Sequence, residues 1–167
     1  MRVFEERQRF NQWWLQILNL SLLGILVYSC LKWFYFKEPV GNVGEADLES
    51  QLVVLILLPA VIGLIYVFKL STLIDERGVM YGFFPFHLKQ KLIPWSEIKQ
   101  CSVRQYRPLS EYGGWGYRMG PKGKAFTVKG NKGIQVVLKN NQKILIGTQK
   151  HNEAQAVIDK YFKHERI

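Results

Sequence analysis

A run of seventeen residues without a charged side chain constrains this chain more than any other feature. Residues 52–68 (LVVLILLPAVIGLIYVF) carry no charge, amide or hydroxyl apart from the phenol of Tyr66. As a helix they extend about 25 Å, and Gln51 and Lys69 can carry the polar ends to the interfaces of a hydrocarbon layer about 30 Å thick. The alternative, a core helix, needs a larger protein around a helix that is apolar on every face. We therefore expect a membrane span over residues 52–70.

A second apolar segment lies upstream, over residues 13–36 (WWLQILNLSLLGILVYSCLKWFYF), with aromatic residues at both ends as in an interfacial belt. A cleaved signal peptide is the alternative, but no A-x-A-like site follows the apolar run. We therefore expect an uncleaved first span. Gln16 and Asn19 share one helix face, which we expect to pack against the second span.

The charges around the two segments predict their orientation. Arg2, Arg7 and Arg9 precede the first segment, and Lys69 follows the second, whereas the connection over residues 37–51 is acidic. The positive-inside rule then places both termini in the cytosol and the short connection outside. We expect a multi-pass protein of a bacterial cytoplasmic (inner) membrane.

The net charge of +10 comes entirely from the second part of the chain. Residues 1–70 hold six Lys and Arg against six Asp and Glu, whereas residues 71–167 hold seventeen against seven. The latter stretch is long enough for one small domain. We therefore expect two parts, a transmembrane helical hairpin over residues 1–70 and a cytosolic domain over residues 71–167. Two cysteines, Cys30 and Cys101, offer no disulfide framework.

The cytosolic part shows strand patterns followed by one helix. Short apolar runs separated by turn residues predict seven strands, at residues 70–75, 79–84, 89–93, 98–106, 124–129, 133–138 and 143–148. Gly130-Asn131 is expected as a tight turn and Asn140-Asn141 as a two-residue type I′ hairpin. We expect an antiparallel meander.

The pattern changes to a helical period near the C-terminus. Asn152 is a suitable N-cap, and five apolar residues repeat at helical spacing: Ala154, Val157, Ile158, Tyr161 and Phe162. We expect this helix to close one end of the sheet. The predicted fold class is an α+β membrane protein with two transmembrane helices, a seven-stranded antiparallel β-barrel or sandwich and a C-terminal capping helix.

Three stretches of the cytosolic part resemble the bacterial pleckstrin-homology-like family, in the form with two N-terminal membrane helices. They are STLIDERGVMYGF at residues 71–83, IPWSEIKQCSV at residues 93–103 and GIQVVLKNNQKILIGTQ at residues 133–149. The resemblance covers residues 70–163 and implies a fold, and a fold does not supply a function. The lipid-headgroup motif K-x-n-(K/R)-x-R of eukaryotic pleckstrin-homology domains is missing from the first hairpin.

The segment between the fourth and fifth predicted strands, residues 107–123, is longer than a strand connection requires. It contains five glycines among aromatic and basic residues, and such long loops are commonly functional. We predict a partner-binding surface made of residue types enriched at binding hot spots: Arg107, Tyr112, Trp115, Tyr117 and Arg118. The alternative is that Trp115 fills the domain core. We do not expect a nucleotide-binding phosphate loop here, because both the G-x-x-x-x-G-K-[ST] pattern and its strand-to-helix context are missing.

Lysines recur along the predicted hairpins. A solvated sheet face, nucleic-acid binding and contact with anionic lipid are the three alternatives for them. A domain tethered directly to a bilayer lies near the negative inner leaflet, which favours lipid. The residues predicted to lie near lipid are Lys69, Lys122, Lys124, Lys129 and Lys132. Nucleic acid would need a docking helix or a stacking face, and we expect no nucleic-acid partner.

No catalytic, metal or cofactor motif is legible in the sequence. His87, His151 and His164 lie far apart without partner cysteines or paired carboxylates, and Glu97 and Glu111 are isolated acids. We therefore expect a non-enzymatic scaffold or adaptor, an accessory subunit of a larger membrane assembly or a homo-oligomer. The alternative is a module that binds anionic lipid or a small ligand at the inner leaflet.

Overall fold

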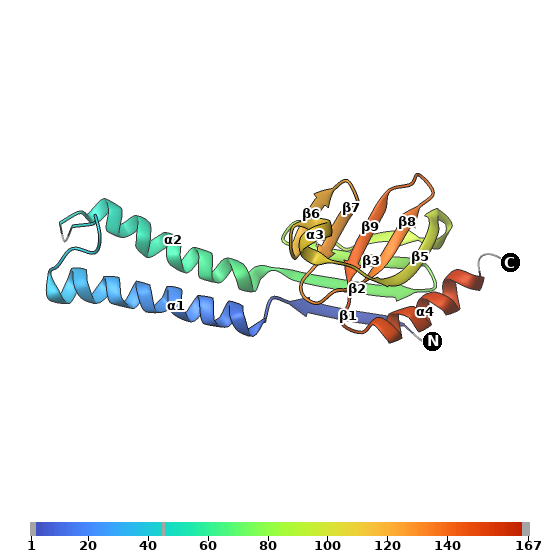
Figure 1. Cartoon of the computed structure of the whole chain (residues 1–167), viewed down its shortest axis with the longest axis horizontal. Helices are drawn as coiled ribbons and strands as arrows, with labels where there is room; N and C mark the ends of the chain where they lie inside the picture. The colour runs from blue at the N-terminus through green and yellow to red at the C-terminus, as the bar shows by residue number, and fades with distance from the viewer. Residues whose placement is uncertain (1–2, 45, 165–167) are drawn as a thin grey trace. The chain divides into compact units, whose positions relative to one another are not determined.

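The computed structural model describes residues 3–44 and 46–164, so Arg2 and Glu45 of the charge argument lie outside the described residues. The chain forms two compact units (Figure 1). Residues Phe10–Val67 form a helical unit, and the N-terminal segment up to Arg9 joins the chain from Phe68 onward in a sheet unit. The expected boundary at residue 70 places the N-terminal segment in the helical part, whereas in the structure this segment belongs to the sheet unit. The sheet unit is therefore discontinuous in sequence.

The helical unit contains the two expected apolar helices. Helix α1 (Trp13–Cys30) continues as a π-helix, η1 (Leu31–Phe36), and α2 spans Leu48–Val67. Both are long and apolar enough to cross a membrane, and only 17% and 6% of their most apolar windows are buried within the protein. Helix α2 begins at Leu48, four residues before the expected span.

A polar cluster joins α1 to α2 within the helical unit. The side-chain amide of Asn19 donates to the Tyr66 hydroxyl oxygen over 3.1 Å, and the Tyr66 hydroxyl donates to Gln16 Oε1 over 2.9 Å. Asn19 is only 6% exposed. The prediction that Gln16 and Asn19 face the second helix is confirmed.

The N-terminal segment forms a strand that the sequence pattern did not predict. Strand β1 (Phe4–Arg9) pairs antiparallel with β2 (Lys69–Asp75), from Phe4 opposite Ile74 to Arg9 opposite Lys69. The two apolar helices are thus inserted between neighbouring strands of one sheet.

The sheet unit contains two sheets rather than one closed barrel. The first sheet has the order β1-β2-β3-β4, with β3 at Gly78–Phe84 and β4 at Lys91–Pro94. The second has the order β5-β8-β9-β7-β6, with strands at Ile98–Gln105 (β5), Gly116–Gly120 (β6), Gly123–Thr127 (β7), Lys132–Leu138 (β8) and Lys143–Gly147 (β9). The expected seven-stranded antiparallel meander is wrong, because β1 and β6 add two strands and β7 pairs parallel to β9.

Two turns of the second sheet differ from the hairpins expected at residues 130–131 and 140–141. Gly130 and Asn131 do not close a hairpin, because β7 pairs with β6 and β9 while β8 pairs with β5 and β9. At the β8–β9 hairpin only Asn141 has a positive φ, of 65°, whereas a type I′ turn requires one at Asn140 as well. The Leu138 N–H donates to the Gln142 carbonyl over 2.9 Å, which closes a longer loop.

The core lies between the two sheets. Tyr81 and Phe83 of β3 contact Phe126 of β7, with ring centroids 5.0 Å and 6.2 Å apart. Ile134 of β8 and Ile146 of β9 are fully buried beside them. Contact between β3 and β7 shows that this interior is shared by both sheets.

A short 3₁₀ helix, η2 (Trp95–Glu97), carries the chain from the first sheet to the second. Trp95 is 3% exposed and its Nε1–H donates to the Asp75 carbonyl over 2.9 Å. Gly78, in the adjoining turn, has φ of 149°, and a Cβ there would lie 2.1 Å from the Ile93 carbonyl oxygen. Residues 74–79 (IDERGV) and residues 93–98 (IPWSEI) therefore form one structural corner.

The C-terminal helix is present as expected, with α4 at His151–His164. Asn152 lies inside its first turn, so the expected N-cap role of Asn152 is wrong. Helix α4 contacts strands of both sheets, and Ala154, Val157 and Ile158 are buried. Gln155 Oε1 accepts a hydrogen bond from the Val103 N–H over 2.8 Å, so α4 also satisfies a backbone donor of β5.

Strand β1 is also tied to the second sheet through buried polar side chains. Glu6 accepts from the Thr148 hydroxyl over 2.6 Å and from the Gln149 N–H over 2.9 Å. The Gln8 side-chain amide donates to the Gly147 carbonyl over 2.7 Å. The N-terminal segment therefore joins the two sheets at the end of β9.

We expect Phe4→Ala to destabilise the sheet unit by about 3–5 kcal/mol, because Phe4 is 2% exposed and large-to-small core changes cost this much. The measurement is equilibrium unfolding of the full chain in mild detergent. The neighbouring Val3, 47% exposed, provides the control, and Val3→Ala should change stability by less than about 0.5 kcal/mol. Equal stability of the two variants would contradict a structural role for β1.

Candidate functional site

The segment predicted as a recognition loop is ordered and covers one face of the second sheet. Residues Pro108–Tyr112 form a short helix, α3, and Gly116–Gly120 form β6, which pairs with β7. Tyr112 is 9% exposed and packs with Tyr106, Ala125 and Leu145 in a small buried cluster. The core-filling role considered for Trp115 is therefore taken by Tyr112.

Glu111 anchors this segment to the sheet. Its carboxylate accepts from Arg104 Nη2 over 3.0 Å and from the Arg107 N–H over 2.8 Å, and Lys122 Nζ lies 3.6 Å away. The hydrogen bond from Arg104 is the main cause that lowers the pKa of Glu111 to about 2. Arg104 is itself positioned by Gln135, whose Oε1 accepts from Nε over 2.9 Å. A carboxylate that is ionised at neutral pH in this way is suited to fixing a loop and unsuited to accepting a proton.

The structure distributes the five predicted partner-binding residues over different environments. Trp115 is half-buried and its Nε1–H donates to the Gly130 carbonyl over 2.8 Å. Tyr117 stacks on Phe126 with centroids 4.9 Å apart and a 3° interplanar angle. Arg107 and Arg118 are exposed, whereas Tyr112 is buried. Only the two arginines are fully presented to solvent.

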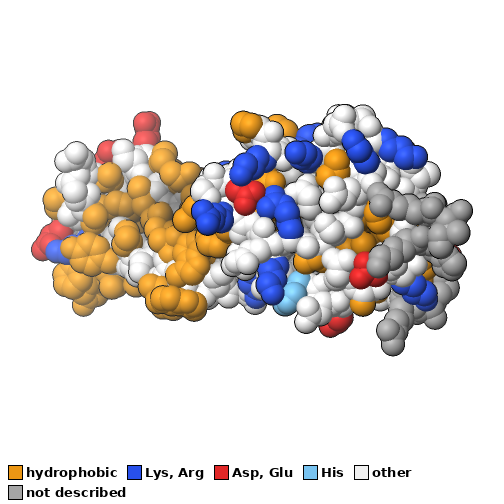
Figure 2. Space-filling view, turned by 45° about the vertical axis from the view of Figure 1, so that its right-hand side comes forward, with side chains coloured by type: hydrophobic (Ala, Val, Ile, Leu, Met, Phe, Trp, Pro, Cys, Tyr) orange, Lys and Arg blue, Asp and Glu red, His pale blue; other side chains and the backbone are white. Residues whose placement is uncertain are grey.

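The five lysines predicted near lipid do not share one location in the sheet unit. Lys69 begins β2, and Lys122 and Lys124 lie at the β6–β7 hairpin. Lys129 lies in the β7–β8 connection and Lys132 begins β8. Lys132 Nζ lies 2.8 Å from His151 Nε2. Figure 2 shows Lys and Arg side chains distributed over the visible face of the sheet unit.

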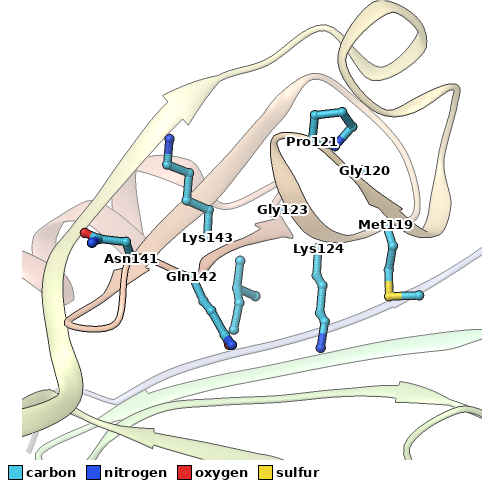
Figure 3. A pocket seen from close by; sticks show the side chains of 9 residues that line it. Met119, Gly120, Pro121, Gly123, Lys124, Asn141, Gln142 and Lys143 are labelled. Carbon is cyan, nitrogen blue, oxygen red and sulfur yellow. The ribbon is translucent and has the colours of Figure 1, made fainter.

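An open hollow of about 680 Å³ lies between the β6–β7 and β8–β9 turns (Figure 3). Lys124 and Ile144 occupy paired positions on β7 and β9, so their side chains share one face of the sheet. Figure 3 shows Lys143 pointing to the opposite side from Lys124. The hollow is lined by Met119, Gly120, Pro121, Gly123, Lys124, Asn141, Gln142, Lys143 and Ile144.

The approach of the two turns depends on a glycine. Gly123 has φ of 103°, and a Cβ there would lie 2.2 Å from the Lys143 carbonyl oxygen. Only glycine therefore lets the β6–β7 turn lie against β9, which brings Lys124 and Lys143 to the same hollow.

A second hollow, of about 540 Å³, adjoins the first because both include Asn141 and Lys143. It lies over the outer face of β5 and β8, and is lined by Lys99, Gln100, Ser102, Arg104, Lys122, Gln135, Val137, Asn141 and Lys143. We name the two together the basic hollows. Besides the apolar Met119, Pro121, Val137 and Ile144, the side chains that line them are cations, amides and one hydroxyl. These polar groups are hydrogen-bond donors suited to an anionic group.

His87 is a neutral ring near Lys124. Its ring lies 5.1 Å from that of Phe126, and its Nδ1 accepts from the Phe83 N–H over 3.3 Å. Burial, with Lys91 and Lys124 nearby, lowers the pKa of His87 below its ordinary value of 6.5. Sequence reasoning missed this group because His87 and Lys91 belong to the β3–β4 hairpin, whereas Lys124 lies on β7.

The described part of the chain, residues 3–44 and 46–164, contains no group of three His, Cys, Asp or Glu residues placed to hold a metal ion. Cys101 is 5% exposed, and burial raises the pKa of its thiol to about 12. This thiol is therefore protonated at neutral pH and unsuited to nucleophilic chemistry.

A scan against protein-family models finds no match to this chain, and a search of the curated proteins finds none either. The resemblance to the bacterial pleckstrin-homology-like family rests on the three sequence stretches alone.

We expect Glu111→Gln to lower stability at neutral pH by about 1–3 kcal/mol, the range for hydrogen bonds to charged groups. The ionised carboxylate is the form that stabilises the fold, so its contribution is complete above pH 4.5 and is lost as the pH falls toward about 2. Thermal melting across this range should show the two proteins converging in acid. Glu97→Gln, at an exposed carboxylate on η2, is the control and should follow the original protein at every pH. A constant difference between Glu111→Gln and the original protein would contradict this assignment.

Proposed function

We propose that this protein is a membrane-anchored, non-enzymatic binding module whose sheet unit takes an anionic group in the basic hollows. The pairing of β1 with β2 supports anchoring by both helices. The chain leaves the sheet after β1, passes through both apolar helices and re-enters the same sheet at the adjacent strand β2. Two crossings of a bilayer are the arrangement compatible with that connectivity. Most of the large apolar side chains of α1 and α2 are exposed within the protein, which supports a lipid environment.

The orientation we propose has the sheet unit in the cytosol of a bacterium. The positive charges that flank the apolar helices support this side, and the family resemblance supports the bacterial source. The seventeen basic residues of the C-terminal part would then face the anionic inner leaflet and cytosolic anions.

The basic hollows support an anionic ligand of phosphate type. Lys124 and Lys143 both line the first hollow, with side chains that point to opposite sides (Figure 3), and Asn141 lines both hollows. A lipid headgroup and a soluble phosphate share this chemistry.

A second candidate is a partner-protein adaptor that uses the α3–β6 segment. Leu109 is 72% exposed and Met119 is 68% exposed, and Arg118 lies beside Met119 on β6. Exposed apolar side chains next to arginine are typical of protein interfaces. This observation favours an accessory-subunit role for the same segment that the sequence singled out.

The anion site predicts a specific effect of Lys124. We expect Lys124→Gln to weaken binding of glycerol 3-phosphate about fivefold, the equivalent of ~1 kcal/mol per nearby cation. The measurement is calorimetric titration of the full chain in phosphatidylcholine nanodiscs. Lys160→Gln, on the exposed side of α4, is the matched control and should bind as the original protein does. Equal affinity of Lys124→Gln and Lys160→Gln would contradict the proposed site.

The orientation predicts a difference in labelling of two exposed asparagines. Asn42 lies in the connection between the apolar helices, and Asn140 lies in the β8–β9 turn. In a chain with Cys30→Ala and Cys101→Ala, we expect Asn42→Cys to react with a membrane-impermeant thiol reagent in intact cells, and Asn140→Cys to react only after permeabilisation. The reverse pattern would overturn the orientation, and equal labelling in intact cells would overturn the two crossings.

A further inference from the structure

The connection between β3 and β4 exposes an apolar cluster that neither the core nor the basic hollows use. We name residues 84–90 (FPFHLKQ) the β3–β4 tip. Phe84 is 42% exposed, Phe86 is 57% exposed and Leu88 is 83% exposed. Three large apolar side chains within five residues of one loop indicate an interaction surface.

The register of the first sheet places this tip at the end where the apolar helices are attached. Phe84 lies opposite Lys69, which follows the end of α2 by two residues, and Arg9 of β1 also lies opposite Lys69. Two chain steps span at most about 7 Å and paired strands lie about 5 Å apart. By chain connectivity alone, the base of the tip is therefore within about 12 Å of the end of α2.

Aromatic contacts hold the tip in one conformation. The Phe86 ring lies 6.2 Å from Phe68 and 5.2 Å from Tyr117. The His87 N–H donates to the Phe83 carbonyl over 2.8 Å, which closes the turn. Leu88 follows directly and is the most exposed of the three apolar residues. Because the loop is already ordered, exposing Leu88 is a fixed property of the fold.

The composition of the tip fits a bilayer interface better than a protein surface. Residues 84–91 contain no carboxylate, and Lys89 and Lys91 follow the apolar residues, with Lys69 across the strand pair. Aromatic and aliphatic side chains bordered by lysine are the arrangement found at the boundary between headgroups and acyl chains. The cations would meet lipid phosphates while Phe86 and Leu88 enter the apolar layer.

We propose that the β3–β4 tip inserts Phe86 and Leu88 into the interfacial layer of the membrane that α1 and α2 cross. The tip is then a third attachment of the sheet unit to the bilayer, besides its two covalent connections. This inference rests on the proposed membrane anchoring and adds a lipid contact that the anchoring itself does not require.

The test compares three labelling sites in the full chain carrying Cys30→Ala and Cys101→Ala. Single cysteines at Leu88, Glu76 and Leu57 are coupled to an environment-sensitive fluorophore, and the protein is reconstituted in phosphatidylcholine vesicles containing phosphatidylglycerol. Glu76 lies in the β2–β3 turn at the opposite end of β2, and Leu57 is exposed on α2. Quenching is measured with lipids that carry a nitroxide near the headgroup or deep in the acyl chain.

We expect the Leu88→Cys label to show blue-shifted emission and quenching by the shallow nitroxide, the Leu57→Cys label to be quenched by lipid nitroxides, and the Glu76→Cys label to show neither effect. Unshifted and unquenched emission at Leu88 with quenching at Leu57 would overturn the tip insertion and leave the anchoring intact. Blue-shifted emission at Leu88 without lipid quenching would also overturn it, because a second copy or a partner protein would then cover the tip. No quenching at Leu57 would overturn the anchoring and the insertion together.

Discussion

The pairing of β1 with β2 is the constraint on which the rest of this structure depends. It makes residues at the N-terminus neighbours of a strand that begins after both apolar helices. The buried Glu6 carboxylate strengthens this constraint, because its partners are Thr148 and Gln149 at the junction of β9 and α4. A buried carboxylate without those donors would be costly, so the N-terminal strand and the C-terminal helix junction are expected to fold together. The strands on either side of the helical segment are thus held together in one folded sheet.

Elements with strong hydrophobic periodicity could be predicted from the sequence. The two strands that could not be predicted, β1 and β6, have buried polar side chains or terminal glycines. Both apolar helices, most strands and α4 follow from composition and spacing. Strand β1 could not be predicted because two of its buried side chains are Glu6 and Gln8, and FEERQR resembles a charged flank of a membrane span. Strand β6 escaped because glycines begin and end it, and glycine normally weakens a strand. The parallel pairing of β7 with β9 depends on which neighbours are available in space, which local patterns do not encode.

The candidate site was accessible to sequence reasoning only in part. Lys122 and Lys124 were selected for their charge, and both line the basic hollows. Glu111 was taken as an isolated acid because its partner Arg104 lies on the preceding strand, and α3 must fold back to bring the two together. Asn141 and Lys143 join the site only because Gly123 allows the β6–β7 turn to approach β9. Contacts between separate hairpins therefore decide which of many lysines share a hollow.

His87 connects the basic hollows to the β3–β4 tip, because it lies in the tip and is close enough to Lys124 for that charge to lower its pKa. Its Nδ1 accepts the Phe83 N–H, and only a ring that is unprotonated at Nδ1 can accept this bond. An anion beside Lys124 would offset part of the lysine charge and raise the pKa of His87. Protonation of His87 would remove this acceptor and add a positive charge next to Leu88, whereas the bond from the His87 N–H to the Phe83 carbonyl does not depend on the ring. His87 therefore joins the backbone of the β3–β4 tip to the surroundings of Lys124.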